Sequence, residues 1–135
     1  MDHFSLDPQL AADTLAVADL PLCAVRLMRD AHYPWLILVP RRAGLAEIID
    51  LGADERSQLM AEIAAASEAL RASFRCDKLN VAAIGNMVRQ LHVHVIARRK
   101  DDLAWPKPVW GFAAPRPYGV GEAEELVKKL AAKLA

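Results

Sequence analysis

The feature that most constrains this chain is a strictly alternating segment in its last third. Residues 90–96 read Gln-Leu-His-Val-His-Val-Ile. Side chains alternate between the two faces of a β-strand, so the pattern predicts a strand with Gln90, His92 and His94 on one face and apolar residues on the other. The apolar face needs a core to cover it, and neighbouring side chains on the polar face stand about 6–7 Å apart. The segment therefore predicts a sheet that carries two imidazoles and an amide close enough together to act on one ligand.

Other runs of β-rich, apolar residues predict the partners of this strand. Such runs occupy residues 22–28, 35–39 and 78–84. We expect 22–28 and 35–39 to pair as antiparallel strands. We expect 78–84 to be joined by a tight turn at Gly85-Asn86 to the strand with the histidines, over 89–98.

Helical periodicity predicts three helices around this sheet. Apolar residues recur at helical spacing over 54–75 and 121–135, and Pro8 opens an apolar stretch that predicts a short helix over 8–17. Between the histidine strand and the last helix, prolines exclude regular structure, and we expect an ordered loop in which Trp105 and Trp110 pack on a surface. The sum is an α+β fold built on an antiparallel sheet.

Composition narrows the class of protein. The length of 135 residues with 54% hydrophobic content predicts one domain over 1–135. The 17 basic and 17 acidic residues cancel, which argues against a nucleic-acid or membrane partner, and any phosphate would need a specific site. Cys23 and Cys76 have no disulfide or zinc-site spacing. The sequence shows neither a signal peptide nor a transmembrane run, so we expect a cytoplasmic protein.

The residues alone leave three interpretations of the histidine strand. The two imidazoles can simply pack and form hydrogen bonds. They can also ligate a metal, with His32, Asp30 or a cysteine as a third ligand, although the spacing indicates none of these and a catalytic site needs at least three protein ligands. In the third interpretation an imidazole acts as a nucleophile, because its pKa of about 6.5 leaves a free nitrogen lone pair at pH 7.

The strand resembles the motif of the histidine triad (HIT) family, His-φ-His-φ-His-φ-φ with φ apolar, and departs from it only at Gln90. Residues 35–41 resemble the earlier strand of the family that ends in Val-Pro-basic, and the likeness covers about residues 20–100, with a further loop and helix over 101–135. Together with Gly85-Asn86 and the Trp-Pro-x-Pro-x-Trp segment, Gln90 resembles a bacterial subgroup that has glutamine at the first triad position. The resemblance implies a sheet of about five strands with packed helices in a homodimer.

The resemblance also implies a function. Members of the family are nucleotide phosphate hydrolases or nucleotidyl transferases, with dinucleoside polyphosphates or nucleoside phosphoramidates as substrates and no metal or other cofactor. His92 would attack the α-phosphate to give a nucleotidyl-histidine intermediate, and His94 would bind a phosphoryl oxygen. Gly85 and Asn86 would lie beside the phosphates. Asp30 would accept hydrogen bonds from the ribose hydroxyls.

The departures from the family pattern suggest what is altered. Gln90 can donate a hydrogen bond or orient the nucleophile, but its amide cannot supply a proton, so good leaving groups such as polyphosphates should be favoured. A catalytically weak nucleotide-binding or regulatory protein is the main alternative. Trp35 stands where several members have a further histidine, and we expect it to pack in the core. Arg98, Arg99 and Lys100 predict a solvated basic run outside the site.

Overall fold

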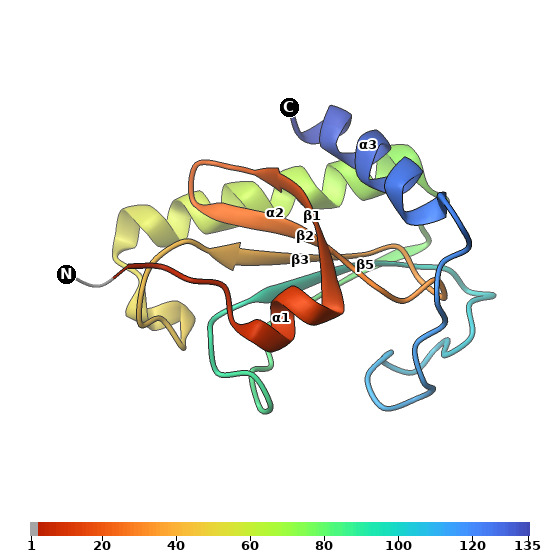
Figure 1. The fold of residues 1–135 in the computed structure, drawn as a ribbon, viewed down its shortest axis with the longest axis horizontal. Helices are drawn as coiled ribbons and strands as arrows, with labels where there is room; N and C mark the ends of the chain where they lie inside the picture. The colour runs from red at the N-terminus through yellow and green to blue at the C-terminus, as the bar shows by residue number, and fades with distance from the viewer. Residues whose placement is uncertain (1–2) are drawn as a thin grey trace.

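The computed structural model describes residues 3–135, and these form one antiparallel sheet with helices on both faces (Figure 1). The five strands lie in the order β1-β2-β3-β5-β4. Their bounds are β1 Thr14–Asp19, β2 Cys23–Met28, β3 Trp35–Pro40, β4 Lys78–Ala82 and β5 Val93–Arg98. The helices are α1 Pro8–Asp13, the 3-10 helix η1 Ile48–Asp50, α2 Ala53–Ser73 and α3 Glu122–Leu134. The predicted α+β class and the sheet of about five strands are therefore confirmed.

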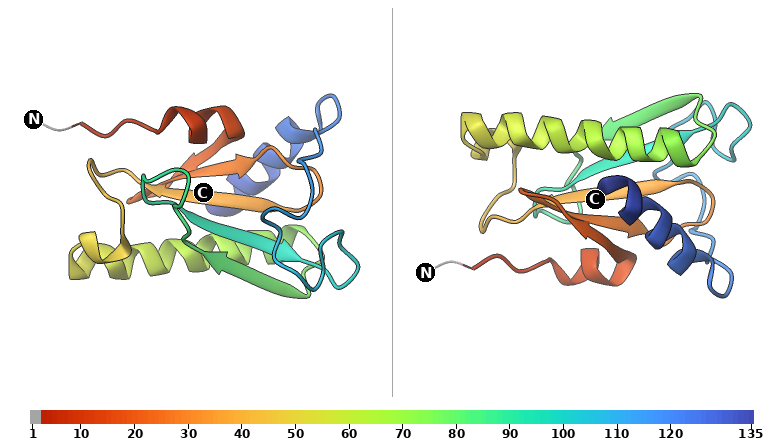
Figure 2. Two further views of the ribbon diagram at one scale, coloured as in Figure 1. Left: turned by 90° about the horizontal axis from the view of Figure 1, so that it is seen from below. Right: turned by 90° about the horizontal axis from the view of Figure 1, so that it is seen from above.

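The sheet separates two hydrophobic clusters. On one face, α2 and α3 cover a cluster that includes Val93, Val95 and Leu70. On the other face, α1 and the segment 99–111 cover a smaller cluster that includes Trp35 and Ile37. Figure 1 and the two views of Figure 2 show α2 and α3 together on one side of the strands and α1 on the other. Because both faces are covered, every residue of the central strands β3 and β5 is buried.

The alternation in β5 decides which side chains reach which layer. Leu91, Val93 and Val95 join the cluster under α2, as the sequence pattern predicted. Ile96 joins the cluster on the opposite face, and period-2 geometry puts His94 and Arg98 on that same face. This face therefore carries the polar side chains of β5.

The predicted helix over 8–17 is wrong in its second half. The helix begins at Pro8, is capped by Asp7, whose side chain accepts a hydrogen bond from the Gln9 backbone N–H (2.8 Å), and ends at Asp13. Thr14 is already extended and starts β1, which pairs antiparallel with β2 from Thr14↔Met28 to Asp19↔Ala24. Pairing with β2 supplies this segment with backbone partners, apart from an irregularity between Ala16 and Ala18, and this tertiary contact outweighs its weak helical pattern.

The predicted strand over 89–98 begins later than expected, at Val93. A loop over 83–92 replaces the predicted tight turn at Gly85-Asn86. Gly85 has φ of +69°, a left-handed conformation that side chains with a Cβ rarely adopt. Within this loop the backbone N–H of Leu91 donates to the Leu45 carbonyl oxygen (3.0 Å), so this stretch is bound to the segment after β3 rather than to a neighbouring strand.

The remaining elements agree with the sequence-based expectations. Strands predicted at 22–28 and 35–39 correspond to β2 and β3, and the helices predicted over 54–75 and 121–135 correspond to α2 and α3. Cys23 and Cys76 are both free thiols. None of the helices formed by residues 3–135 has the length and apolar character needed to cross a membrane.

Candidate active site

His92 and His94 lie together on the face of the sheet covered by α1 and the segment 99–111. His94 belongs to β5, where it is paired with Ile37 of β3, and His92 stands immediately before the strand. Each residue is 6% exposed, and the two rings meet edge to face with centroids 5.0 Å apart. The structure therefore brings together the two histidines that the sequence pattern singled out.

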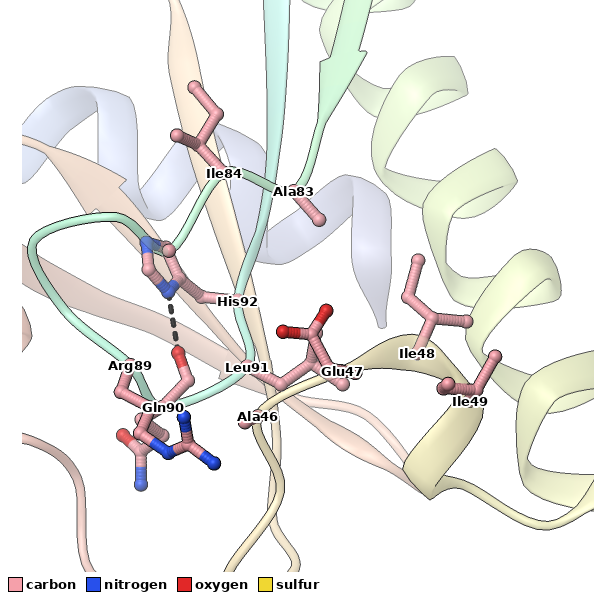
Figure 3. Close-up of a pocket in the computed structure, with 11 residues that line it drawn as sticks. Ala46, Glu47, Ile48, Ile49, Ala83, Ile84, Arg89, Gln90, Leu91 and His92 are labelled. Atoms are coloured by element: carbon pink, nitrogen blue, oxygen red, sulfur yellow. Dashed lines mark hydrogen bonds between the residues drawn. The ribbon is translucent and has the colours of Figure 1, made fainter.

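Hydrogen bonds define the tautomer of each ring. Nδ1 of His92 lies 2.7 Å from the backbone carbonyl oxygen of Gln90 (Figure 3). A carbonyl oxygen only accepts, so this nitrogen carries the proton and the neutral ring keeps its lone pair on Nε2. Nδ1 of His94 accepts from the indole N–H of Trp35 (3.0 Å), which places the proton of neutral His94 on Nε2. One ring thus offers a lone pair, and its neighbour offers an N–H donor.

The environment of His94 keeps it neutral. Burial, and then the charge of the neighbouring His92, lower the pKa of His94 from its ordinary value of 6.5 to about 4. At pH 7 this histidine is therefore an uncharged donor. Trp35 and Trp110 enclose the ring, with centroids 5.7 Å and 5.1 Å from that of His94. Trp35, expected to pack in the core, both packs there and sets the tautomer of His94.

A cavity of about 330 Å³ opens beside the two imidazoles. Most of its wall is apolar, with side chains from α1, β2, β3, the loop 83–92 and the segment 99–111. Polar groups come from Asp13, Asn86, His92 and His94. The residues that line it are Leu10, Asp13, Met28, Ile37, Ile84, Gly85, Asn86, Met87, Val88, His92, His94 and Trp110. A lining of this kind suits a ligand with an apolar body and a polar end that reaches the histidines.

A second, more polar cavity of about 290 Å³ lies on the other side of His92. Figure 3 shows residues that line it, with Arg89 beside Gln90 and Glu47 on the separate segment that leads into η1. The two cavities share Ile84, Gly85 and His92. His92 therefore stands where an apolar chamber and a charged chamber meet.

Four of the six residues predicted for the site line the apolar cavity, and the side chain of Gln90 makes other contacts. Gly85 and Asn86 line the apolar cavity together with His92. The side chain of Gln90 is turned toward the amino-terminal segment, where Oε1 accepts from the Asp7 backbone N–H (2.9 Å) and Nε2 donates to the Ser5 carbonyl oxygen (2.8 Å). The backbone of Gln90, rather than its amide, contacts His92.

Asp30 is not brought to the histidines. Its carboxylate is buried, and it accepts hydrogen bonds from the backbone N–H of His32 (3.0 Å) and of Arg116 (3.2 Å). It also contacts Nδ1 of His32 at 2.8 Å. These bonds tie the turn between β2 and β3 to the segment before α3. Asp30 is not among the described residues that line the two cavities at His92. Asp13, the last residue of α1, lines the apolar cavity instead.

The sequence pattern also missed Arg98, which was expected to be solvated. Its side chain is 1% exposed and lies at the end of β5, on the same face as His94. Only a buried partner makes such a charge tolerable, and that partner, Asp102, lies four residues away, in the segment after the strand. The i, i+4 spacing of Arg98 and Asp102 is the one signal in the sequence that pointed to it.

Metal binding gains no support from the arrangement of ligands. Among residues 3–135, no group of three or more His, Cys, Asp or Glu side chains is placed to hold an ion. Nδ1 of His92 is bound to a carbonyl and Nδ1 of His94 to an indole. What the pair can do chemically is present one lone pair and one donor to the same cavity.

Comparison with known proteins gives a consistent result. The HIT domain matches residues 9–101. The crystal structure of a histidine triad protein from Bradyrhizobium japonicum is similar, with 48% identity and a TM-score of 0.96, over 99% of this chain and 100% of that one. One from Marinobacter aquaeolei VT8 has 44% identity and a TM-score of 0.94 over 99% and 100%. One from Sinorhizobium meliloti 1021 has 41% identity and a TM-score of 0.94 over 97% of each chain.

No curated protein sequence matches the chain. The domain match nevertheless covers more than half of the residues, and the similar structures extend over nearly all of them. The two buried histidines lie inside the matched region, at the positions that the sequence motif indicated. The chain belongs to the HIT domain family.

Proposed function

We propose that this protein is a nucleotide hydrolase or nucleotidyl transferase that acts at the α-phosphate through a covalent intermediate on His92. The proposed substrates are dinucleoside polyphosphates or nucleoside phosphoramidates. The observation that carries the proposal is the 2.7 Å contact between Nδ1 of His92 and the Gln90 carbonyl oxygen, because it directs the lone pair to Nε2. Membership of the HIT domain family supports a nucleotide hydrolase or transferase at the general level.

The reaction would take two displacements at phosphorus. In the first, Nε2 of His92 forms a bond to the α-phosphorus while the bond from phosphorus to the leaving group breaks, and the leaving group departs with the electron pair. In the second, water or another acceptor attacks the same phosphorus and the phosphorus–nitrogen bond breaks. The imidazole recovers its lone pair. The acceptor loses its proton to solvent, and with water as acceptor the product is a nucleoside monophosphate.

His94 would stabilise the phosphoryl oxygens during both displacements. Its Nδ1 is held by Trp35, so the neutral ring directs its Nε2–H toward the cavity. A fixed donor in a site with little water stabilises developing negative charge without having to reorganise. Because the pKa of His94 is lowered to about 4, this donor keeps one protonation state throughout the neutral pH range.

The apolar cavity would hold the nucleoside. Leu10, Ile37 and Val88 offer apolar walls for a base, and Gly85 lets the backbone approach the phosphates closely. In place of Asp30, we propose Asp13 as the acceptor for ribose hydroxyls, because this residue lines the cavity and a carboxylate has acceptor capacity beyond the bond that its Oδ1 receives from Gln9. Asp13→Asn should then raise KM for a ribonucleotide but leave KM for its 2′,3′-dideoxy analogue unchanged.

In this proposal Gln90 shapes the choice of leaving group, and we propose that it places the protein in a glutamine subgroup of the family. Its amide has no acidic proton and is bound to Ser5 and Asp7, so a leaving group would have to depart as an anion or take a proton from solvent. We therefore expect polyphosphate leaving groups to be favoured over amines. Gln90→His should accelerate phosphoramidate cleavage more than polyphosphate cleavage, and equal effects on both would contradict this.

The same observation favours a second candidate, a catalytically weak nucleotide-binding or regulatory protein. A retained cavity without an acid at the first triad position would still bind a nucleotide. The two candidates differ in one respect: only the enzyme forms a bond between His92 and phosphorus. In the binding protein, His92→Ala would change affinity without changing any turnover.

We also propose that the protein acts as a cytoplasmic homodimer. Strand β4 lies at an edge of the sheet, and Val81 on it is 49% exposed. Pairing of two β4 edges about a two-fold axis would continue the sheet and cover this strand. The molar mass in solution, measured by light scattering, should be twice that of the chain, and Val81→Lys should lower it to the monomer value.

Intact-protein mass spectrometry tests the central step. Wild type and His92→Ala are mixed with a panel of adenylated substrates and quenched without acid, because a phosphorus–nitrogen bond is acid-labile. We expect an adenylyl adduct on the wild type alone, and the substrate that gives it identifies the leaving group. Tight nucleotide binding with neither adduct nor turnover would replace the enzyme by the nucleotide-binding protein.

A further inference from the structure

Arg98 occupies an unusual position for a cation. Its guanidinium lies between the rings of Tyr33 and Trp105, with Cζ 5.6 Å and 5.5 Å from their centroids. Nε and Nη2 donate to the two carboxylate oxygens of Asp102 (2.8 Å and 3.0 Å), and Nη1 donates to Oδ1 of Asn80 (2.9 Å). A bidentate pair of this kind fixes both position and orientation.

The partner of Arg98 organises the start of the segment 99–111. The carboxylate of Asp102 also accepts from the backbone N–H of Arg99 (3.0 Å) and of Trp105 (2.9 Å). Further along, Ala104 and Val109 are buried in the cluster that contains Trp35. The segment has no regular secondary structure, so its path over the sheet depends on these few attachments.

The same segment ends over the histidines. The ring of Trp110 meets that of His94 edge to face at 5.1 Å between centroids and that of Trp35 at 5.8 Å. Trp110 also forms part of the cavity wall beside His92 and His94. Arg98 and His94 are therefore connected twice, through β5 and through the segment that Arg98 anchors.

We propose that Arg98 is a positioning residue of the active site, which holds the segment 99–111 so that Trp110 covers His94 and excludes water from it. The guanidinium does not touch the cavity, because it lies between Tyr33 and Trp105 and is not part of the cavity wall in the described residues. Its effect reaches the histidine through Trp110. Any effect of Arg98 on catalysis rests on the proposed function, in which His94 is a hydrogen-bond donor to the substrate. The effect of Arg98 on the position of Trp110 does not depend on that function.

The surroundings of His94 make its protonation a sensitive reporter of this cover. The groups that face it are Trp110 from the segment 99–111, Trp35 from β3 and His92 from the loop before β5, and Asp13 from α1 lines the same cavity. Burial is the largest cause of the lowered pKa. Removing the cover readmits water and stabilises the imidazolium, so the pKa should rise.

The experiment is an NMR titration of the His94 ring in the full-length protein, with the resonance assigned from His94→Asn. Wild type should titrate at about 4. In Arg98→Lys, which keeps the charge but loses the fork, and in Trp110→Ala, the pKa should rise by about one pH unit or more. The double variant should match Trp110→Ala alone, because both act through the same cover. Arg26→Lys is the control, since this half-buried arginine bonds to Thr14 and not to the segment 99–111.

Each outcome decides the proposal without any substrate, so a protein that proves inactive still tests it. A folded Arg98→Lys protein with His94 unchanged at about 4 overturns it, as does Trp110→Ala without a rise. If Arg98→Lys does not fold, as judged by far-UV circular dichroism, Asp102→Asn is titrated in its place and the same rise is required. An equal rise in Arg26→Lys would also overturn the proposal, because the effect would then be general loosening of the sheet.

Discussion

Strand β5 carries His94 near its start and Arg98 at its end, both on the same face. The two residues differ in how far the protein itself satisfies their hydrogen-bonding groups. Around Arg98 the donors are matched by acceptors from Asp102 and Asn80. Nearby, Asp30 is likewise occupied by His32 and Arg116. At the histidine end, the side-chain hydrogen bonds that His92 and His94 form within residues 3–135 go through Nδ1, and both residues line the apolar cavity.

The difference separates scaffold from site. Where every polar group has a protein partner, the interactions hold segments together and no group remains to bind a ligand. Where one nitrogen of a ring is used to orient it and the other is left over, the group is prepared for an external partner. Hydrogen bonding alone does not separate His32 from the site, because its Nδ1 also lies 2.8 Å from one partner, the Asp30 carboxylate, and it too lines a cleft. What separates it is position, since His32 is not among the described residues that line the two cavities at His92.

The largest expected effect is on turnover, and it is tested by comparing His92→Ala with His32→Ala. Replacing His92 with Ala removes the proposed nucleophile, so turnover of an adenylated polyphosphate should fall by about 10⁴-fold or more. His32→Ala, the matched control at the other end of the sheet, should keep turnover within about threefold of wild type, because its loss costs stability rather than chemistry. Steady-state kinetics on both variants measures this. A protein in which His32→Ala is the inactive variant would invert the assignment of site and scaffold.

The next largest expected effect is a loss of stability when Arg98 is replaced. Arg98→Met leaves the Asp102 carboxylate, whose side chain is 5% exposed, without its cation. Breaking a buried pair in this way should lower the free energy of unfolding by about 3–5 kcal/mol. Urea denaturation measures the change.

The neighbouring Arg99 is the control for that measurement. It pairs with Asp101 at the surface (2.9 Å), where both side chains are about half exposed. Arg99→Met should therefore change the free energy of unfolding by less than about 0.5 kcal/mol. Equal losses in the two variants would remove the distinction between a buried pair that holds the segment 99–111 and a surface pair beside it.

Acid should expose the cost of holding His94 neutral. Its pKa is 6.5 in the ordinary state and about 4 in the folded protein, so the unfolded chain binds more protons between these values. The free energy of unfolding should then fall as the pH is lowered from about 6.5 toward 4, by a total on the order of 3 kcal/mol. Above pH 6.5 this contribution is fully present.

Denaturation curves of wild type and His94→Asn between pH 4.5 and 7.5 measure this contribution. The asparagine Oδ1 can still accept from Trp35, but the side chain does not titrate, so the slope should flatten. Staying above pH 4.5 avoids carboxylates such as Asp102. Burial raises the pKa of this carboxyl, but hydrogen bonds from Arg98 and the backbone together outweigh burial and lower the pKa from its ordinary value. An unchanged slope in His94→Asn would mean that His94 is not the group held neutral.

Local patterns in the sequence predicted the elements and the inward-facing residues well. The period of β5 put Leu91, Val93 and Val95 against α2, and the helical stripe of α2 buried Leu59 and Ile63. These predictions succeeded because hydrophobic periodicity depends on the residues themselves. The pairing of His92 with His94 followed from the same period, and so did their common cavity.

What failed depended on partners far away in the chain. Arg98 looked solvated because its ring partner Tyr33 and its acceptor Asn80 are contributed by other elements. Thr14–Asp19 became a strand because β2 was available to pair with it. Neither the partners of Arg98 nor the pairing of β1 with β2 can be predicted from the residues next to them in the sequence. The contacts of the Gln90 amide could not be predicted for the same reason, since the residues that bind it lie more than 80 positions away.

Gln90 supplies the smallest prediction, because its side chain belongs to the scaffold while its backbone belongs to the site. Gln90→Ala removes two neutral hydrogen bonds to Ser5 and Asp7, which should lower the free energy of unfolding by about 1–2 kcal/mol. The carbonyl that orients His92 stays, so turnover on a polyphosphate should fall by less than about tenfold. Gln9→Ala, which loses an exposed bond to Asp13, is the stability control. If Gln90→Ala instead abolished turnover and left stability unchanged, the amide of Gln90 would act on the substrate. Its side chain would then belong to the active site rather than to the scaffold.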